Sequence, residues 1–303
     1  MLLSGIIFSG RLVAFIAFLF EHSPDSVHSE NLAVHAFTRN WCAMLTYEFR
    51  IPMPLSSKEY RIGQLYGTLK ASLNETGGGE GVEILENRPY EGGGQYTKKV
   101  YFLQSKVPKL VGKIAPKGSL ELHEESWNTY PTGETRLSNS YLKDKFFIRI
   151  KTVVIDDDDG GQENIFELKD KALKKRKIKR IDIANDEIKS EDYEKKEDPS
   201  RFKSKIGGGR GPLPQDWLSR VRPSCTVYKL VKCQFDWWLQ KKIEDKIMEI
   251  QQRFFTLFHR RIFCWLDEWV RLNMAEVRQL EKEVQTELKK QRASGEVRGV
   301  RSP

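Results

Sequence analysis

A few polar side chains fall on strand faces whose other members are apolar. Side chains two residues apart in a strand point to the same face. By this period Lys229 joins an otherwise apolar row, as do Thr97 and Lys99 beside Tyr101, and Thr152 after Ile150. A buried ammonium group is costly unless an anion or a hydrogen-bond acceptor meets it. We interpret these positions as the polar lining of a mostly apolar cavity that holds one charged headgroup.

Each of these side chains also has an ordinary structural explanation. A lysine can cover apolar surface with its stem while its amine reaches water, and threonine is common in strands. Glu281 lies beside Leu280 and one turn from Val277, at the edge of the apolar stripe of an expected helix. A glutamate at such an edge is usually exposed to solvent. The cavity interpretation depends on all of them together.

Two adjacent indoles, Trp237 and Trp238, follow the expected strand over residues 226–236. Consecutive side chains diverge on a strand and on a helix, so the pair does not fill a single core. Indole suits the interface of a bilayer, and a net charge of +9 favours anionic lipid headgroups. The alternative is one core tryptophan and one at the rim.

The composition sets broad limits on function. With 303 residues and 39% hydrophobic content, the chain can form one large domain or two small ones. The four scattered cysteines lack metal-ligand spacing, which indicates reduced structural thiols in a cytosolic protein. The histidines form no catalytic constellation, and the glycine loop at 207–211 lacks the Lys-Ser/Thr of a phosphate-binding loop. We therefore expect no enzyme, no metal site and no cofactor.

The first 44 residues differ from the rest of the chain. Residues 2–20 are apolar except for small residues and Arg11, which fits a signal peptide or a marginal membrane anchor. A polar connector follows, and regular patterning starts only after Met44. Our preferred hypothesis is that Met44 is the functional start and that residues 1–44 are an extension created by the gene model.

The rest of the chain alternates strand patterns with amphipathic helices. Period-two patterns predict strands at residues 46–52, 95–103, 119–123, 145–155 and 226–236. Ser56 and Glu59 have capping-box spacing for a helix to about Ser72, and residues 171–180 are a basic helix end or edge. A 3.6-residue period from Leu239 to Leu272 predicts one long helix, and Asn273 caps a second. These elements indicate an α+β fold with an antiparallel sheet.

Many ordered phrases resemble the class I phosphatidylinositol transfer proteins. They lie at residues 59–66, 74–83, 94–97, 103–108, 127–128, 202–204, 209–213, 228–231 and 265–267. The resemblance covers residues 44–291 and implies a START-like helix-grip fold. In that fold a concave, mainly antiparallel sheet and long C-terminal helices enclose a single phospholipid cavity. The resemblance thus implies a transfer domain at 45–291 and a flexible basic tail at 292–303.

The resemblance also implies roles for particular residues. Thr97, Lys99, Asn128 and Glu281 would contact an inositol ring, and Gln64, Thr135, Thr152 and Lys229 would surround the phosphate. Phe258 would line the cavity. Trp237 and Trp238 match a membrane-inserting pair, and Ser204 matches a position that the family can phosphorylate.

The sequence departs from the family pattern near the implied site. Relatives have a cysteine after Tyr-Pro-x, associated with choline-lipid binding, where this chain has Gly133. The glycine usual after the tryptophan pair is missing, and the hairpin before Gln95 is shorter than usual. Because of the first departure, the resemblance supports phosphatidylinositol transfer more strongly than phosphatidylcholine transfer.

The implied function is carriage of one phosphatidylinositol, and of phosphatidylcholine, between membranes. The carrier would be a cytoplasmic monomer that binds membrane surfaces transiently and binds no nucleic acid, with phospholipid as cargo. The alternatives are a phosphatidic-acid carrier of the same fold, a nucleic-acid-binding protein that uses the basic residues 171–180, and an enzyme that acts on phospholipids.

Overall fold

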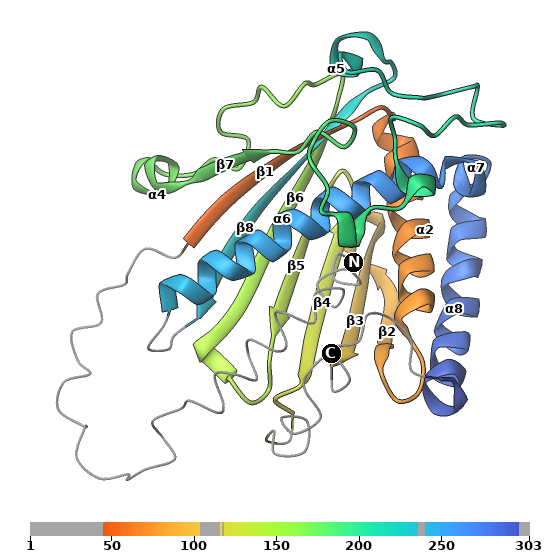
Figure 1. Cartoon of the computed structure of the whole chain (residues 1–303). Helices are drawn as coiled ribbons and strands as arrows, with labels where there is room; N and C mark the ends of the chain where they lie inside the picture. Colours follow the sequence, from red (N-terminus) through yellow and green to blue (C-terminus); the bar gives the residue numbers. More distant parts are fainter. Residues whose placement is uncertain (1–44, 104–115, 117, 236–239, 297–303) are drawn as a thin grey trace.

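The computed structural model describes residues 45–103, 116, 118–235 and 240–296 (Figure 1). Its centre is an eight-stranded sheet in the order β2-β3-β4-β5-β6-β8-β1-β7, antiparallel except for the parallel pair β1 and β7. The strands are β1 (Leu45–Met53), β2 (Gly81–Tyr90), β3 (Gly94–Phe102), β4 (Glu121–Thr129), β5 (Thr132–Ser138), β6 (Phe146–Asp156), β7 (Lys177–Arg180) and β8 (Cys225–Phe235). The fold is α+β and START-like, as the sequence predicts.

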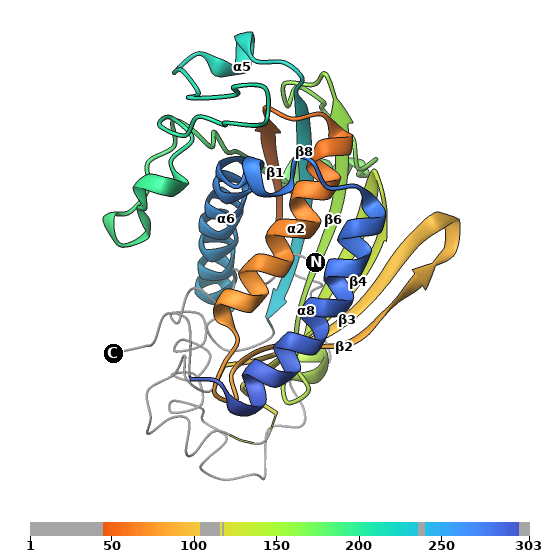
Figure 2. The ribbon, with the colours of Figure 1, turned by 90° about the vertical axis from the view of Figure 1, so that its right-hand side faces the viewer.

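Helices cover one face of this sheet (Figures 1 and 2). They are α2 (Ser57–Glu75), α6 (Gln240–Cys264), the short α7 (Leu266–Trp269) and α8 (Met274–Ser294). Phe49 of β1 meets Phe255 of α6 edge to face, with ring centroids 5.1 Å apart. The buried core therefore lies between this face and the helices. The short helix α4 (Asp170–Lys175) has no buried residue, whereas α5 (Trp217–Arg220) contributes the buried Trp217 to the core.

Capping boxes fix where α2 and α8 begin. Ser56 Oγ accepts the Glu59 backbone N–H while the Glu59 carboxylate accepts the Ser56 N–H, as the spacing predicts. Asn273 and Glu276 form the same reciprocal pair at α8. The helix α8 ends at Ser294, three residues beyond the expected domain boundary, and Arg292 donates to Glu83 of β2.

The prediction of one helix from Leu239 to Leu272 is wrong. The helix α6 ends at Cys264, and α7 follows after Trp265. The indole N–H of Trp269 donates to the Ile262 carbonyl, the acceptor that a continuous helix would use for the Leu266 N–H. The Asp267 carboxylate meanwhile accepts the backbone N–H groups of Lys205 and Ile206. These tertiary bonds turn the chain.

Some strands differ from the pattern-based expectations. The strand expected at 119–123 is β4, which continues to Thr129, whereas β2 and β5 were not predicted. Much of β2 is exposed, and Glu134 and Arg136 pair on the surface of β5, so neither strand has a continuous apolar row. The basic segment 171–180 combines the end of α4 with the edge strand β7.

No helix in the described ranges is both long and apolar enough to cross a membrane. The described cysteines Cys225, Cys233 and Cys264 are free and buried, in line with structural thiols. Residues 1–44 and the tryptophan pair at 237 and 238 lie outside the described residues.

Helix α2 approaches α7 closely only because residue 63 is a glycine. A Cβ at Gly63 would lie 2.8 Å from Cζ2 of Trp269, whereas one at Gly67 would meet its nearest neighbour, in Ile262, at 3.4 Å.

Gly63→Ala should lower the free energy of unfolding by about 1–3 kcal/mol through overpacking, despite alanine's higher helix propensity. Gly67→Ala is the matched control and should leave the free energy of unfolding unchanged or raise it. Urea denaturation measures both values, and equal effects of the two substitutions would refute the role of the close contact between residue 63 and Trp269.

Candidate functional site

The strand register gathers the polar residues on the helix-covered face. One row across the sheet runs Gln95, Asn128, Gly133, Thr152, Lys229 and Phe49 on neighbouring strands β3 to β1. The next row on the same face contains Thr97, Ser126 and Thr135, and the one after it contains Lys99 and Glu124. Directly opposed side chains in such rows have Cβ atoms about 4.5–5.5 Å apart. The fold thus brings together six predicted site residues from β3, β4, β5, β6 and β8.

Lys229 is the most constrained member of these rows. Its side chain is fully buried, and the only hydrogen bond recorded for its amine in the described structure goes to Thr152 Oγ1, at 3.4 Å. The amine also lies 5.4 Å from the centroid of the Phe255 ring. Burial lowers the pKa of Lys229 from 10.5 to about 7. The site therefore favours an anion that would meet this ammonium group.

A neutral histidine lies beside Lys229. The Nδ1 atom of His259 is 2.7 Å from the Phe255 carbonyl, which only accepts, so Nδ1 carries the proton. Its Nε2 then accepts from the Tyr60 hydroxyl at 3.0 Å. Burial, and secondly the charge on Lys229, lowers the pKa of His259 to about 3. His259 therefore adds no second positive charge beside Lys229.

Lys99 has a carboxylate partner, in contrast to Lys229. Its amine lies 3.8 Å from Oε1 of the fully buried Glu124. Tyr101 donates its hydroxyl to the other Glu124 oxygen at 2.9 Å, and Ser126 donates to Oε1 at 3.3 Å. Ser126 and Thr135 share a hydrogen bond of 3.1 Å. This chain of contacts links the Lys99 end of the site to the β5 hydroxyl.

Glu281 reaches the site from α8 and closes a polar network over β2 and β3. Its carboxylate accepts from Arg278 at 2.7 Å and from the Asn87 amide at 3.2 Å. The Asn87 oxygen accepts from Gln95 at 2.6 Å and from Thr97 at 3.4 Å. Glu281 is 3% exposed, so it is a buried contact of α8 and not the solvated edge residue of the ordinary interpretation.

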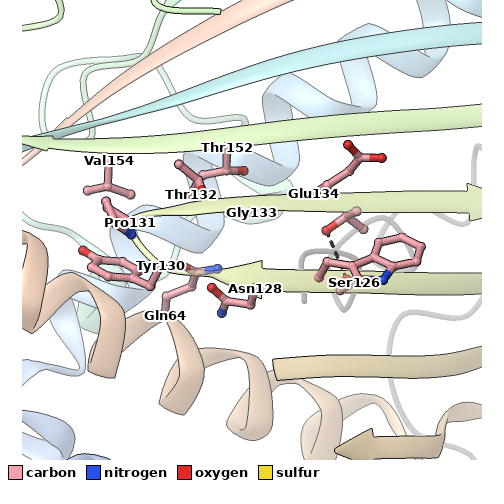
Figure 3. Close-up of a pocket in the computed structure, with 12 residues that line it drawn as sticks. Gln64, Ser126, Asn128, Tyr130, Pro131, Thr132, Gly133, Glu134, Thr152 and Val154 are labelled. Carbon is pink, nitrogen blue, oxygen red and sulfur yellow. Dashed lines mark hydrogen bonds between the residues drawn. The ribbon is translucent and has the colours of Figure 1, made fainter. Parts of the chain in front are cut away.

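A pocket opens where Gly133 interrupts the row between Asn128 and Thr152. Figure 3 shows Gln64 of α2 next to Asn128 of β4, with Thr152 of β6 beyond Gly133. The residues that line the pocket include four predicted site residues, Gln64, Asn128, Thr135 and Thr152. A Cβ at Gly133 would lie 3.4 Å from the Trp127 carbonyl oxygen, so a small side chain would fit there.

The remaining predicted residues lie elsewhere. Phe258 is 2% exposed on α6 and packs against Phe254, with ring centroids 5.4 Å apart. Ser204 is buried, donates to the Asp267 carboxylate and accepts the Gly207 N–H at 2.7 Å. A phosphate on Ser204 would break both contacts. No group of three or more potential metal ligands occurs within the described part of the chain.

Three polar residues of the site were not predicted from the sequence. Glu124 and Asn87 contact the predicted residues because of the strand register, which no pattern in the sequence indicates. Gln251 lies on the core stripe of α6 one turn before Phe255 and is fully buried. Neither of its amide atoms has a hydrogen-bond partner in the described structure. Its place among apolar residues at helical spacing was a usable signal.

An antiparallel sheet with one helix-covered face and buried rows of polar groups defines a START-like ligand-binding protein. The family profile described as "Phosphatidylinositol transfer protein" matches residues 44–286, so the chain belongs to this family.

Proteins similar to this chain come from animals and an amoeba. The beta isoform of phosphatidylinositol transfer protein from Bos taurus is 46% identical over 267 residues, which cover 85% of this chain and 98% of that protein. The beta isoform from Homo sapiens has the same identity and coverage. Phosphatidylinositol transfer protein 1 of Dictyostelium discoideum is 41% identical over 253 residues, covering 82% of this chain and 95% of that protein.

The buried amine of Lys229 predicts a pH dependence of the lipid-free protein. Its pKa is about 7 in the fold and near 10.5 when unfolded, so the unfolded chain binds the extra proton between these values. The free energy of unfolding should therefore rise as pH increases from about 7 to 10, and this contribution should level off below pH 7. Thermal unfolding across this range measures it. Lys229→Met should remove the rise, and an unchanged profile in that variant would assign it to another group.

Proposed function

We propose that this protein carries one phosphatidylinositol molecule in the space between the sheet and its covering helices, and exchanges it between membranes. The observation that carries the proposal is the buried Lys229 ammonium group, whose only hydrogen-bond partner among the described residues is Thr152, at 3.4 Å. A phosphodiester would supply the missing negative charge in a low-dielectric setting. The family and the relatives' names support phosphatidylinositol as the lipid.

The rows suggest how the headgroup lies. We place the phosphate at Lys229, Thr152, Thr135 and Gln64, three of which lie around or next to Gly133. The inositol ring then extends along the sheet toward Asn128, Thr97 and Lys99, with Glu281 above it. Hydroxyl, amide and carboxylate groups are suitable partners for a polyol because each can donate to or accept from a ring hydroxyl.

The lipid's linker and chains lie beyond the phosphate in this arrangement. The buried Gln251 amide lies one helical turn from Phe255, whose ring faces the Lys229 amine. An ester carbonyl of a glycerolipid would accept its N–H. Phe258 contributes apolar surface from the same helix.

A closed cavity explains why a carrier speeds exchange. Each buried methylene contributes about 0.8 kcal/mol, so about thirty acyl methylenes exposed to water would cost roughly 24 kcal/mol. We propose that the protein shields these chains and performs no reaction on them, and that phosphatidylcholine is the lipid taken up in exchange.

We further propose that the protein is a cytoplasmic monomer. It would bind membrane surfaces transiently through Trp237 and Trp238.

The decisive experiment identifies the lipid that co-purifies with the protein and tests Lys99. Lys99→Ala should reduce phosphatidylinositol transfer between vesicles by at least about tenfold, because inositol contacts are lost, and leave phosphatidylcholine transfer within about twofold. Lys98→Ala, on the opposite face of β3, is the matched control. Mass spectrometry of extracted lipid and a fluorescent vesicle assay provide the readouts.

The outcomes separate the rival functions. Equal loss of both lipids in Lys99→Ala would refute the headgroup assignment. Bound phosphatidic acid alone would support the phosphatidic-acid carrier. Conversion of lipid by the pure protein would indicate an enzyme, and bound nucleic acid without lipid would indicate the nucleic-acid-binding protein.

Gly133 provides a test of headgroup preference. Gly133→Cys places a thiol in the gap between Asn128 and Thr152, where a Cβ fits without clash. In the family that this sequence resembles, a cysteine at this position is associated with the binding of choline lipids. Phosphatidylcholine transfer by Gly133→Cys should therefore rise severalfold relative to phosphatidylinositol transfer. Gly133→Ser is the control for added volume. Competitive transfer from mixed vesicles measures the ratio, and identical ratios in all three proteins would contradict the expectation.

A further inference from the structure

Most of the chain's net charge is concentrated in twelve residues. Residues 169–180 contain eight lysines and arginines and one acid, Asp170, a net charge of +7 out of +9 for the whole chain. They form α4 and the edge strand β7, here called the basic surface. The remaining 291 residues are therefore close to neutral.

The cations of the basic surface divide into two groups. Arg176 donates to the buried Glu48 carboxylate at 2.5 Å, Arg180 to the Asp159 carbonyl at 2.5 Å, and Lys177 lies 4.0 Å from Asp245. These contacts fix the segment to β1, to the loop after β6 and to α6. The second group is exposed and has no ion pair in the described residues: Lys169, Lys171, Lys174, Lys175 and Lys179.

Strand directions place this surface at one end of the sheet. The strand β7 runs parallel to β1 with Lys177 opposite Tyr47, so α4 extends past the N-terminal end of β1. Because β1 is antiparallel to β8, with Leu45 opposite Cys233, β8 finishes at this same end. Figure 1 shows α4 beside the start of β1, with the end of β8 and the first turn of α6 at that side of the molecule.

We propose that the basic surface binds the anionic headgroups of a membrane and orients this end of the sheet toward the bilayer. These five lysines, which have no ion pair among the described residues, are exposed along α4 and β7 and so match a negatively charged plane better than a small ligand. Ile178, which is 44% exposed on β7, adds apolar contact at the same place. A spread cationic surface is also suited to weak, reversible binding.

This inference rests on the proposed carrier function, since a carrier must visit membrane surfaces. It assigns a role to lysines that lie on the outer edge of the sheet, away from the rows that hold Lys99 and Lys229. A nucleic acid is the competing polyanion, and the experiment includes it.

The test compares Lys174→Ala/Lys175→Ala with a control that loses the same charge. A lysine near an anionic bilayer contributes roughly fivefold in affinity, so the double variant should bind phosphatidylcholine/phosphatidylserine vesicles about 25-fold more weakly. Binding to pure phosphatidylcholine vesicles should stay unchanged. Lys282→Ala/Lys289→Ala, on exposed positions of α8, should change binding less than about threefold. Vesicle co-sedimentation at low and high salt provides the affinities.

Other results would overturn the proposal. An unchanged vesicle affinity in the Lys174/Lys175 variant would contradict it. An equal loss of vesicle affinity in the α8 control would also contradict it, because binding would then depend on net charge alone. Loss of oligonucleotide binding with unchanged vesicle binding would assign the surface to nucleic acid. Mass spectrometry of the bound lipid is the separate readout for the carrier function. A Lys174/Lys175 variant that still contains bound phosphatidylinositol but no longer binds the vesicles would support the role of the basic surface. It would also show that the lipid cavity is intact.

Discussion

The buried Lys229 ammonium group is the constraint around which the rest of the site is arranged. Apolar rows of β1 and β8 and the aromatic face of α6 surround it, and its neighbours Tyr60 and His259 satisfy one another. Because His259 is neutral, it adds no second positive charge beside this amine. Burial therefore makes ionisation of this amine dependent on what occupies the adjacent space. An anionic headgroup would gain most from meeting it there.

The two lysines of the site differ in a way that suits different partners. Lys99 already faces the Glu124 carboxylate at 3.8 Å, so the pair is close to neutral and can hydrogen-bond to hydroxyl groups. Lys229 has no carboxylate partner in the described part of the chain and retains its attraction for a full negative charge. The sheet thus separates a region suited to a neutral polyol from a region suited to a phosphate, several strands apart.

The sequence predicted those parts of the fold and site that depend on local periodicity. Capping residues fixed the starts of α2 and α8, and apolar alternation identified β1, β3, β6 and β8. Lys99, Lys229, Thr97 and Thr152 stood out because each breaks an apolar row. Asn128, Thr135 and Gln64 came only from the family resemblance, because their proximity depends on register between distant segments. Periodicity also failed at Cys264, where the Trp269 indole takes the Ile262 carbonyl from the helix.

The outer strands of the sheet carry a consequence for solubility. Strand β7 is exposed along all four residues, three of them basic, while β2 at the other edge carries Glu86, Arg88 and Pro89. Exposed strand edges are templates for self-association, and charges or a proline hinder pairing with a second copy. Like charges on two β7 strands would repel, and Pro89 lacks the N–H that a new neighbour would require. The cations that β7 contributes to the basic surface thus also hinder aggregation through this edge of the sheet.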